Sequence, residues 1–379
     1  MKRVMRKITI VFAVAACAHA PTSKLRPPPG ATRERAAYVF PPMEIKAGPP
    51  EQIAIADLNE QELMAGGTAA FAAEDFKKAA TYFDRLSDSF PGSDKHVPAL
   101  YNAGLAHARL AQYVEAQARF QAVADADKDA KGVVGQDGVD ALFRVAECQY
   151  SLGRFTDAAA TLAPLIDRAD LTPARRADAA TKRGICLFQG KDLASAEAQL
   201  REALRRYKEE LGDEADEYGV SQAQFYLAEV FRSYFEQLTL SPDNATEKQL
   251  TDQLEAKAEM LLSAQGHYLR CMRLGDPEWT TASGYRIGEL YENFHAALTT
   301  APVPKDLDEE QTAAYRDELK RRVRILITKS IEVYEKTLAA AQRVNATNPF
   351  IEKTRASLDR LKDFLLKEET AADSKKAPT

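Results

Sequence analysis

The sequence is poor in the residues from which most catalytic and metal sites are built. It has five histidines in 379 residues, and no two of them have the short spacing of a zinc ligand pair. It has no glycine-rich phosphate loop, and no serine or cysteine stands in a strand-turn-helix elbow. The acidic run 125–129 begins like a calcium loop, but it lacks the required glycine at Ala130 and the glutamate at Gln136. We therefore expect a protein that is not an enzyme and that binds no metal and no cofactor.

Long hydrophobic runs are also missing. The apolar run Ile8–Ala16 has nine residues, far fewer than the roughly 20 that a membrane-spanning helix needs, and no later run is longer. Basic residues are also fewer than acidic ones: the chain has 51 Lys and Arg and 56 Asp and Glu, which gives a net charge of −5. An acidic chain is a poor partner for nucleic acid and for anionic lipid. Any membrane contact would therefore depend on a lipid anchor.

Residues 1–16 have the features of an export signal, with basic residues placed before the apolar run. The sequence then reads Val14-Ala15-Ala16-Cys17, which resembles a bacterial lipobox. This resemblance implies that Cys17 is acylated and becomes the first residue of the mature protein. The alternative is an ordinary secretory signal that is cleaved near Ala18 or Ala20. Because alanine rather than aspartate follows the cysteine, the resemblance implies lipid anchoring to the periplasmic face of the outer membrane.

Residues 17–57 are rich in proline and show no helical periodicity. Proline removes backbone donors and favours extended conformations, so we expect a tether between the lipidated cysteine and the folded body. The tether is either a plain spacer or a docking strip for a partner.

The stretch from Leu63 to Phe120 contains the pattern of one helical hairpin twice. The spaced positions are Leu63, Gly67, Phe76, Ala79, Phe83 and Pro91 in the first copy, and Leu100, Gly104, Tyr113, Ala116 and Phe120 in the second. The pattern resembles the tetratricopeptide repeat (TPR), a 34-residue helix-turn-helix. In this repeat, small residues let the two helices touch and large residues fill the gap to the next repeat. The resemblance implies an all-α fold, a TPR superhelix (α-solenoid) of about six helical hairpins with a C-terminal capping helix.

The same pattern continues along most of the chain, with longer and looser units after residue 210. We expect the array to occupy residues 58–368 and to end in a helix that covers the last repeat. The polar residues that follow lack helical periodicity and are expected to be disordered. The expected repeats lie near 60–93, 97–129, 139–170, 177–210, 221–273 and 281–344, with the cap at 349–366 and the disordered tail at 369–379.

The cysteines after the signal do not predict disulfides. Cys148 and Cys186 occupy equivalent positions in successive repeats. Equivalent positions on packed helices lie about 8–10 Å apart, beyond the roughly 7 Å limit for a disulfide. We expect both to be small buried hydrophobic residues.

In the TPR family, positions 2, 5, 9, 12 and 13 of each first helix face the concave side of the array. Large aromatic side chains recur at positions 5 and 12, which share one helix face. Such a ladder would suit an extended or helical segment of a partner. The alternative is that the rings pack within the array. The candidate groove residues are Met64, Tyr101, Phe143, Phe225 and Tyr285 at position 5, where the fourth unit has Thr181 instead, and Phe71, Tyr150 and Phe188 at position 12.

Acidic residues recur at position 9, where Glu147, Glu229 and Glu289 are added to the candidate groove. The carboxylate clamp of cytosolic chaperone co-factors uses the same scaffold, but it needs Lys and Asn at positions 5 and 9, which this chain lacks. We therefore do not expect recognition of an acidic C-terminal peptide.

Two further resemblances bear on function. The segment Phe76–Pro91 is similar to periplasmic repeat proteins that serve outer-membrane β-barrel assembly and Tol-Pal coordination. The segments Tyr285–Tyr291 and Ala301–Leu307 are similar to envelope repeat proteins of gliding bacteria, including motility components. They imply a scaffold of a periplasmic envelope complex that holds envelope proteins in its groove. The rival class is a module that binds peptidoglycan or another envelope polymer.

Overall fold

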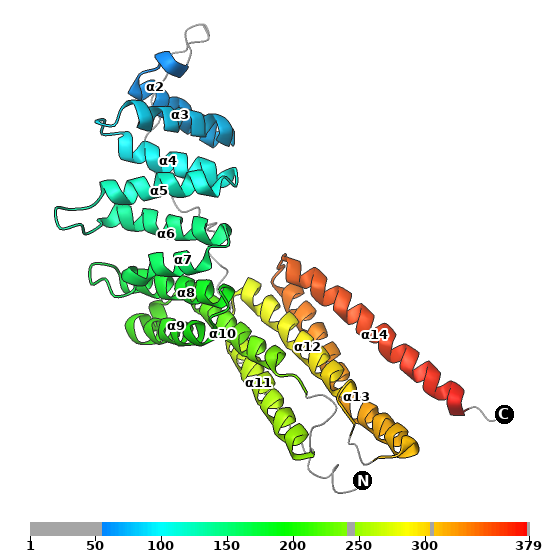
Figure 1. Cartoon of the computed structure of the whole chain (residues 1–379). Helices are drawn as coiled ribbons and strands as arrows, with labels where there is room; N and C mark the ends of the chain where they lie inside the picture. The colour runs from blue at the N-terminus through cyan, green and yellow to red at the C-terminus, as the bar shows by residue number, and fades with distance from the viewer. Residues whose placement is uncertain (1–54, 241–246, 304–306, 377–379) are drawn as a thin grey trace. The chain divides into compact units, whose positions relative to one another are not determined.

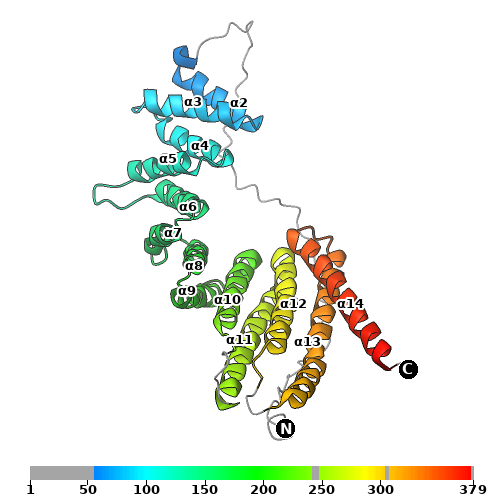
Figure 2. The same ribbon diagram turned by 45° about the vertical axis from the view of Figure 1, so that its right-hand side comes forward.

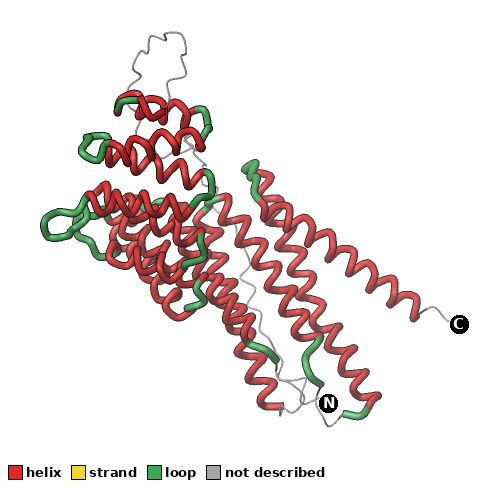
Figure 3. Tube along the Cα trace, turned by 45° about the horizontal axis from the view of Figure 1, so that its top comes forward, coloured by secondary structure: helices red, strands yellow, loops and turns green. Residues whose placement is uncertain are grey.

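A computed structural model describes residues 55–240, 247–303 and 307–376 of the chain. The signal at 1–16, Cys17 and the tether up to residue 54 lie outside the described residues. The described parts are helical and contain no β-strand (Figure 3). The predicted all-α repeat fold is confirmed. Ile55–Asp57 form a single 3-10 turn, η1, and the residues from Leu58 onward form a separate compact unit.

The first part of this unit consists of four short hairpins, in which each helix packs on the next along the chain (Figure 1). The hairpins are α2 (Glu60–Ala72) with α3 (Phe76–Ser89), α4 (His96–Arg109) with α5 (Tyr113–Ala126), α6 (Gln136–Ser151) with α7 (Phe155–Leu162), and α8 (Pro173–Gln189) with α9 (Leu193–Arg206). A 3-10 turn, η2 (Ala163–Leu165), extends α7, and a π turn, η3 (Tyr207–Leu211), extends α9.

Each of these hairpins turns through one residue in the left-handed backbone region. The residues are Glu74, Ala111, Gly153 and Lys191, and their φ angles lie between 57° and 73°. In each turn the next residue is the N-cap of the second helix, and at Asp75 and Asp192 its carboxylate accepts a bond from the backbone. The sequence between the helices therefore sets a tight turn, which brings the two helices of a hairpin side by side.

Glycine lets the paired helices approach closely. A Cβ atom added to Gly67 would lie 2.6 Å from the ring of Phe83, and one added to Gly104 would lie 2.8 Å from the ring of Phe120. Real Cβ atoms do not approach other heavy atoms so closely, so the glycine is required where the ring of the second helix crosses the first. The spacing that resembles the TPR is thus explained by packing inside each hairpin.

The second part of the unit is built from longer helices (Figure 2). Contacts join α10 to α9 and α11, α12 to α11 and α13, and α14 to α12 and α13. The helices are α10 (Glu217–Gln237), α11 (Glu247–Leu274), α12 (Pro277–Thr299), α13 (Glu309–Arg343) and α14 (Pro349–Lys376).

The last helix is longer than the sequence pattern indicates. We expected α14 to end near Leu366 and a disordered tail to begin at residue 369, but the helix continues to Lys376. Ion pairs support its extension, since Lys367 bonds to Asp363 one turn earlier and Glu369 lies 2.5 Å from Arg324 on α13. Good helix formers and such pairs sustain a helix without an apolar stripe, which is why hydrophobic periodicity missed this segment.

Candidate partner-binding site

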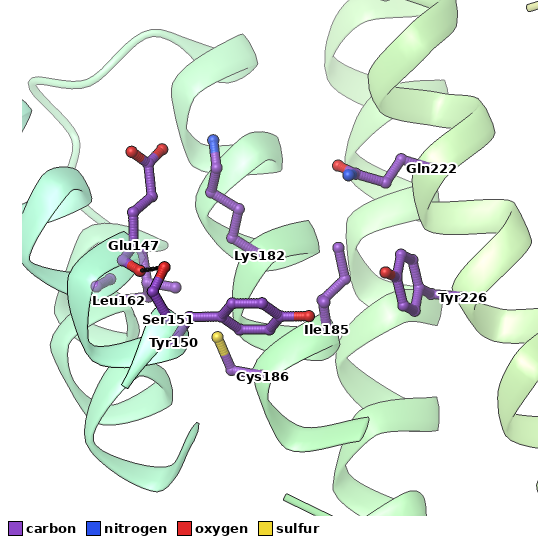
Figure 4. Close-up of a pocket in the computed structure, with 10 residues that line it drawn as sticks. Glu147, Tyr150, Ser151, Leu162, Lys182, Ile185, Cys186, Gln222 and Tyr226 are labelled. Atoms are coloured by element: carbon purple, nitrogen blue, oxygen red, sulfur yellow. Dashed lines mark hydrogen bonds between the residues drawn. The ribbon is translucent and has the colours of Figure 1, made fainter. Parts of the chain in front are cut away.

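A pocket of about 350 Å³ opens between the first helices of three successive hairpins, α6, α8 and α10 (Figure 4). The floor includes the side chains of Ile185 and Cys186 from α8. Residues on α6 and α10 form the two walls, and Leu162 reaches the pocket from α7. The lining residues are Ala146, Glu147, Tyr150, Ser151, Leu162, Lys182, Ile185, Cys186, Gln222 and Tyr226.

Two tyrosines face each other across the pocket. The ring of Tyr150 points from α6 toward that of Tyr226 on α10 (Figure 4). Phe155 holds the first ring edge-on at 5.2 Å between centroids, and Phe188 holds the second at 5.8 Å. The amide of Gln189 donates a 3.2 Å hydrogen bond to the Tyr150 hydroxyl. Burial raises the pKa of both tyrosines, so both phenols are neutral and present a rigid apolar face with a polar tip.

The charges at the rim are balanced. Glu147 accepts a 2.8 Å bond from Arg144, and Lys182 lies 2.7 Å from Asp178. Each charged group at the mouth already has a partner one turn away on its own helix. The pocket therefore has no net field that would select an ion of one sign.

The thiol on the floor is not an activated nucleophile. Cys186 is buried, and burial raises its pKa to about 11. A thiol with this pKa is protonated at neutral pH, and its pocket contains no histidine that could act as a base. The lining suits binding rather than covalent chemistry.

Several of the predicted groove residues belong to this pocket or lie beside it. Glu147 and Tyr150 line it directly, and Phe188 packs edge-on against Tyr226. Phe143 is buried, with the cationic groups of Arg175 and Lys182 both 5.4 Å from its ring centroid. Thr181 is fully buried and bonds to Ala177 of its own helix.

The predicted groove residues nearer the N-terminus pack within the array. Tyr101 is half-buried and meets Phe120 edge-on at 5.3 Å, while Phe71 meets Phe76 in the same way at 5.2 Å. Met64 packs on the core of its own hairpin and the next. These side chains follow the packing alternative of the sequence analysis.

Beyond the pocket, the predicted groove is closed. Glu229 is 3% exposed and Phe225 is 4% exposed, because α11 and α12 cover them. Phe225 packs against Trp279 with 5.1 Å between ring centroids. Tyr285 and Glu289 are half-buried, and the Tyr285 hydroxyl donates a 3.3 Å bond to Glu289. These four residues do not reach the pocket, so the ladder expected over six repeats is confined to three helices.

Sequence reasoning missed several pocket residues. Ser151, Ile185 and Gln222 stand at positions 13, 9 and 2 of their helices, which the positional rule had marked as groove-facing. Their side chains belong to neither the aromatic series nor the acidic series that recurs along the repeats, so the pattern does not identify them. Lys182 and Tyr226 stand at position 6, outside the rule, and no sequence signal identified them.

A second hollow beside the loop 127–136 does not form a cation site. Its carboxylates serve the loop itself, since Asp129 accepts bonds from the backbone of Lys131 and Val133, and Asp127 accepts one from Gly138. Within residues 55–240, 247–303 and 307–376, no group of three or more His, Cys, Asp or Glu side chains could hold a metal ion. No helix in the same ranges is long and apolar enough to cross a membrane.

Comparison with known proteins identifies the repeat type. Residues 101–170 and 149–210 match the tetratricopeptide repeat family model. No curated protein matches the chain.

Solved structures of similar fold are distant in sequence. They include the apo form of RapI, with 10% identity, a TM-score of 0.45, and coverage of 82% of this chain and 100% of that chain. A tetratricopeptide repeat protein from Parabacteroides merdae has 12% identity and a TM-score of 0.36, over 80% of this chain and 98% of that one. The Rap conjugation gene regulator of the plasmid pLS20, solved with the Phr* peptide, has 16% identity and a TM-score of 0.35. The match covers 89% of this chain and 82% of that one. Residues 101–210 therefore carry tetratricopeptide repeats, and the described chain has the all-helical fold that such repeats build.

Proposed function

We propose that this protein is a non-enzymatic scaffold that binds a segment of a partner protein in the pocket between α6, α8 and α10. One observation carries the proposal: three successive first helices open onto a pocket of about 350 Å³ between two opposed tyrosines. Aromatic residues in a preformed pocket supply much of the energy of protein interfaces. The other aromatic residues of the predicted ladder are buried or half-buried and pack within the array.

The lining indicates the chemistry of the bound segment. The floor and walls are mostly apolar, whereas the tyrosine hydroxyls and the amide of Gln222 can bond to the polar backbone of a peptide. Because the charged groups at the rim are already paired, the segment should bury apolar side chains and need not carry a particular charge. We propose an uncharged stretch of a partner with apolar side chains of leucine or phenylalanine size.

The place of action is proposed from the sequence. The lipobox at Val14–Cys17 supports a lipid anchor on the outer membrane, and residues 17–57 would give the array reach into the periplasm. The envelope resemblances support a role in an outer-membrane assembly or gliding-motility type of complex. Replacing Cys17 with Ser should move the full-length protein from the membrane fraction to the soluble fraction. Retention in the membrane fraction would contradict the anchor while leaving the pocket proposal intact.

The pocket is tested through Ser151, which is exposed at its rim. A photo-crosslinking amino acid at this position should attach a partner protein in living cells, whereas the same group at the exposed Arg355 on α14 should not. Affinity for the crosslinked segment is then measured by fluorescence anisotropy. Ser151→Trp should fill the pocket and weaken binding by about tenfold or more, and Ser151→Ala should change little. Equal affinities of the two variants, or crosslinks only to cell-wall glycan, would reject the proposal.

A further inference from the structure

A second surface, separate from the pocket, combines three arginines that share one carboxylate partner with an unexplained helical glycine. We call it the Gly266 face. It is formed by Gly266, His267, Arg270 and Arg273 of α11 together with Arg201 of α9, and Phe231 of α10 lies between the two helices. α10 contacts both α9 and α11 along this side of the unit (Figures 1 and 2).

Gly266 differs from the glycines of the repeats. At Gly67 and Gly104 a Cβ atom would collide with an aromatic ring, so packing requires glycine. At Gly266 an added Cβ would meet only the guanidinium of Arg270, at 3.9 Å. Glycine in the middle of a helix disfavours that helix, and nothing in the described structure offsets the cost here. Its remaining use is to let another backbone or ligand approach α11 closely.

The arginines around this glycine are under-neutralised. Among the described residues, Arg270 and Arg273 make no ion pair or hydrogen bond, and both side chains are exposed. Arg201 has one partner, Glu197, at 2.9 Å. Burial and the neighbouring charges of Arg201 and Arg273 lower the pKa of Arg270. Within the described residues, Arg201, Arg270 and Arg273 thus have one carboxylate partner between them, Glu197, although the chain as a whole has a net charge of −5.

Stacked rings hold this surface rigid. The guanidinium of Arg201 lies 5.6 Å from the centroid of Phe231, and the Phe231 ring stacks on His267 at 5.1 Å with an interplanar angle of 10°. The amide of Gln224 donates to Nδ1 of His267 at 2.6 Å, which places the proton of the neutral imidazole on Nε2. That N–H has no acceptor among the described residues.

We propose that the Gly266 face binds an acidic segment of a partner protein, whose carboxylates bond to Arg270, Arg273 and Arg201 while its backbone passes close to Gly266. Guanidinium groups form short, paired bonds with carboxylates, which matches donors left free in this arrangement. A short acidic protein segment fits better than nucleic acid or an anionic membrane, because its charges can stay beside the three arginines, whereas a long polyanion or a membrane would extend over a chain of net charge −5. The exposed Leu262, one turn before Gly266, offers an apolar contact that a peptide can use.

The test uses the full-length protein and a fluorescent oligoglutamate peptide, with oligoglutamine as the uncharged control. The protein should bind oligoglutamate, and added salt should weaken the binding. Arg270→Ala and Arg273→Ala should each reduce affinity by about tenfold, since each removes a charge-assisted bond. Arg355→Ala, which removes an exposed arginine of α14, is the matched control and should have no effect.

Gly266→Ala separates a binding role from a structural one. Alanine favours the helix, so the melting temperature should rise, but the added methyl should weaken oligoglutamate binding. A rise in melting temperature with unchanged affinity would show that the glycine serves no partner.

His267 gives a direct report on the site. Burial, with the charges of Arg270 and Arg201, lowers its pKa to about 4. Among the described residues, Glu197, which is paired with Arg201, is the one carboxylate that bonds to this group of side chains. Carboxylates bound beside the ring should raise the His267 pKa, as followed by NMR titration with and without peptide. An unmoved pKa, no binding of oligoglutamate, or binding only of anionic vesicles or orthophosphate would overturn the proposal.

Discussion

The Nε atom of Arg286 on α12 lies 3.0 Å from an Oε1 atom of Glu229 on α10. The N–H makes no well-aligned hydrogen bond, so the contact is an ion pair. Arg232 also pairs with Glu229, at 2.9 Å, and the hydroxyl of the fully buried Tyr268 on α11 donates to the same carboxylate. One acidic side chain therefore joins three helices, although its position in the repeat predicts that it faces an open groove.

Removing that carboxylate should destabilise the protein strongly. Glu229→Ala leaves two arginines without their buried counter-ion, and we expect a loss of about 3–5 kcal/mol in the free energy of unfolding, measured by urea denaturation. Glu289→Ala is the matched control, because Glu289 pairs with the same Arg286 but is half-exposed. It should cost about 1 kcal/mol or less. Similar losses in the two variants would show that burial does not set the strength of this network.

The close approach of helices at Gly104 should make this position intolerant of alanine. The added methyl would lie 2.8 Å from the Phe120 ring, and we expect overpacking to cost about 1–3 kcal/mol. In the open site at Gly266 the same change should stabilise the helix by up to about 1 kcal/mol. Thermal unfolding of both variants measures the two effects. If both changes stabilise the protein, ring packing does not explain the glycine of the repeat.

His107 should make the stability of the first hairpins depend on pH. Its Nε2 atom lies 2.9 Å from Asp84, and the hydrogen bond to that carboxylate raises the pKa of His107. Gln112 and Arg119 also face this group. Because the folded-state pKa is above the ordinary value of about 6.5, the stabilisation is complete below that value and is lost as the pH rises through the folded-state pKa.

The corresponding measurement compares wild type with His107→Gln. The stability difference between them should be larger near about pH 5 than near about pH 8. A difference that is constant over this range, or that grows with pH, would contradict the assigned direction.

Lys257 should act as a cap for the end of α10. Its Nζ atom donates to the backbone oxygens of Phe235 and Leu238 at 2.6 and 2.7 Å, and it lies 3.9 Å from the Phe235 ring centroid. Lys257→Met would leave two carbonyls unpaired, at an expected cost of about 2–4 kcal/mol. Lys248 lies at the exposed start of α11, the helix that also carries Lys257, and Lys248→Met should cost about 0.5 kcal/mol or less. Hydrogen exchange in the last turn of α10 should accelerate in Lys257→Met and not in Lys248→Met. Equal exchange rates in the two variants would contradict the capping role of Lys257.

The fold could be predicted because its determinants are close together in the sequence. Gly67 and Phe83, or Gly104 and Phe120, lie one helix apart, and each pair records a contact within a single hairpin. Apolar residues repeat with the period of a helix, and aspartates such as Asp75 and Asp192 mark where second helices begin. These local rules act in every repeat, so a pattern seen twice is enough to indicate the array.

The site could be predicted only in part, because exposure depends on residues far away in the chain. Tyr150 and Glu147 reach the pocket as their helix positions indicate. The opposite wall is formed by Tyr226 on α10, which is the fourth helix after α6 in the sequence. Phe225, the neighbour of Tyr226, is instead covered by Trp279 of α12. No property of α10 alone distinguishes these two fates.

The helices, the tight turns between them and the repeat type follow from the amino-acid sequence, since neighbours within one hairpin supply the contacts that stabilise each element. Which side chains remain accessible depends on how the helices pack together. Helices α11 and α12 pack over Glu229 and Phe225 and leave α6, α8 and α10 open at the pocket. The physical reason is that burial is a property of the assembled array, in which long helices late in the chain exclude solvent from a face that the short early hairpins leave exposed.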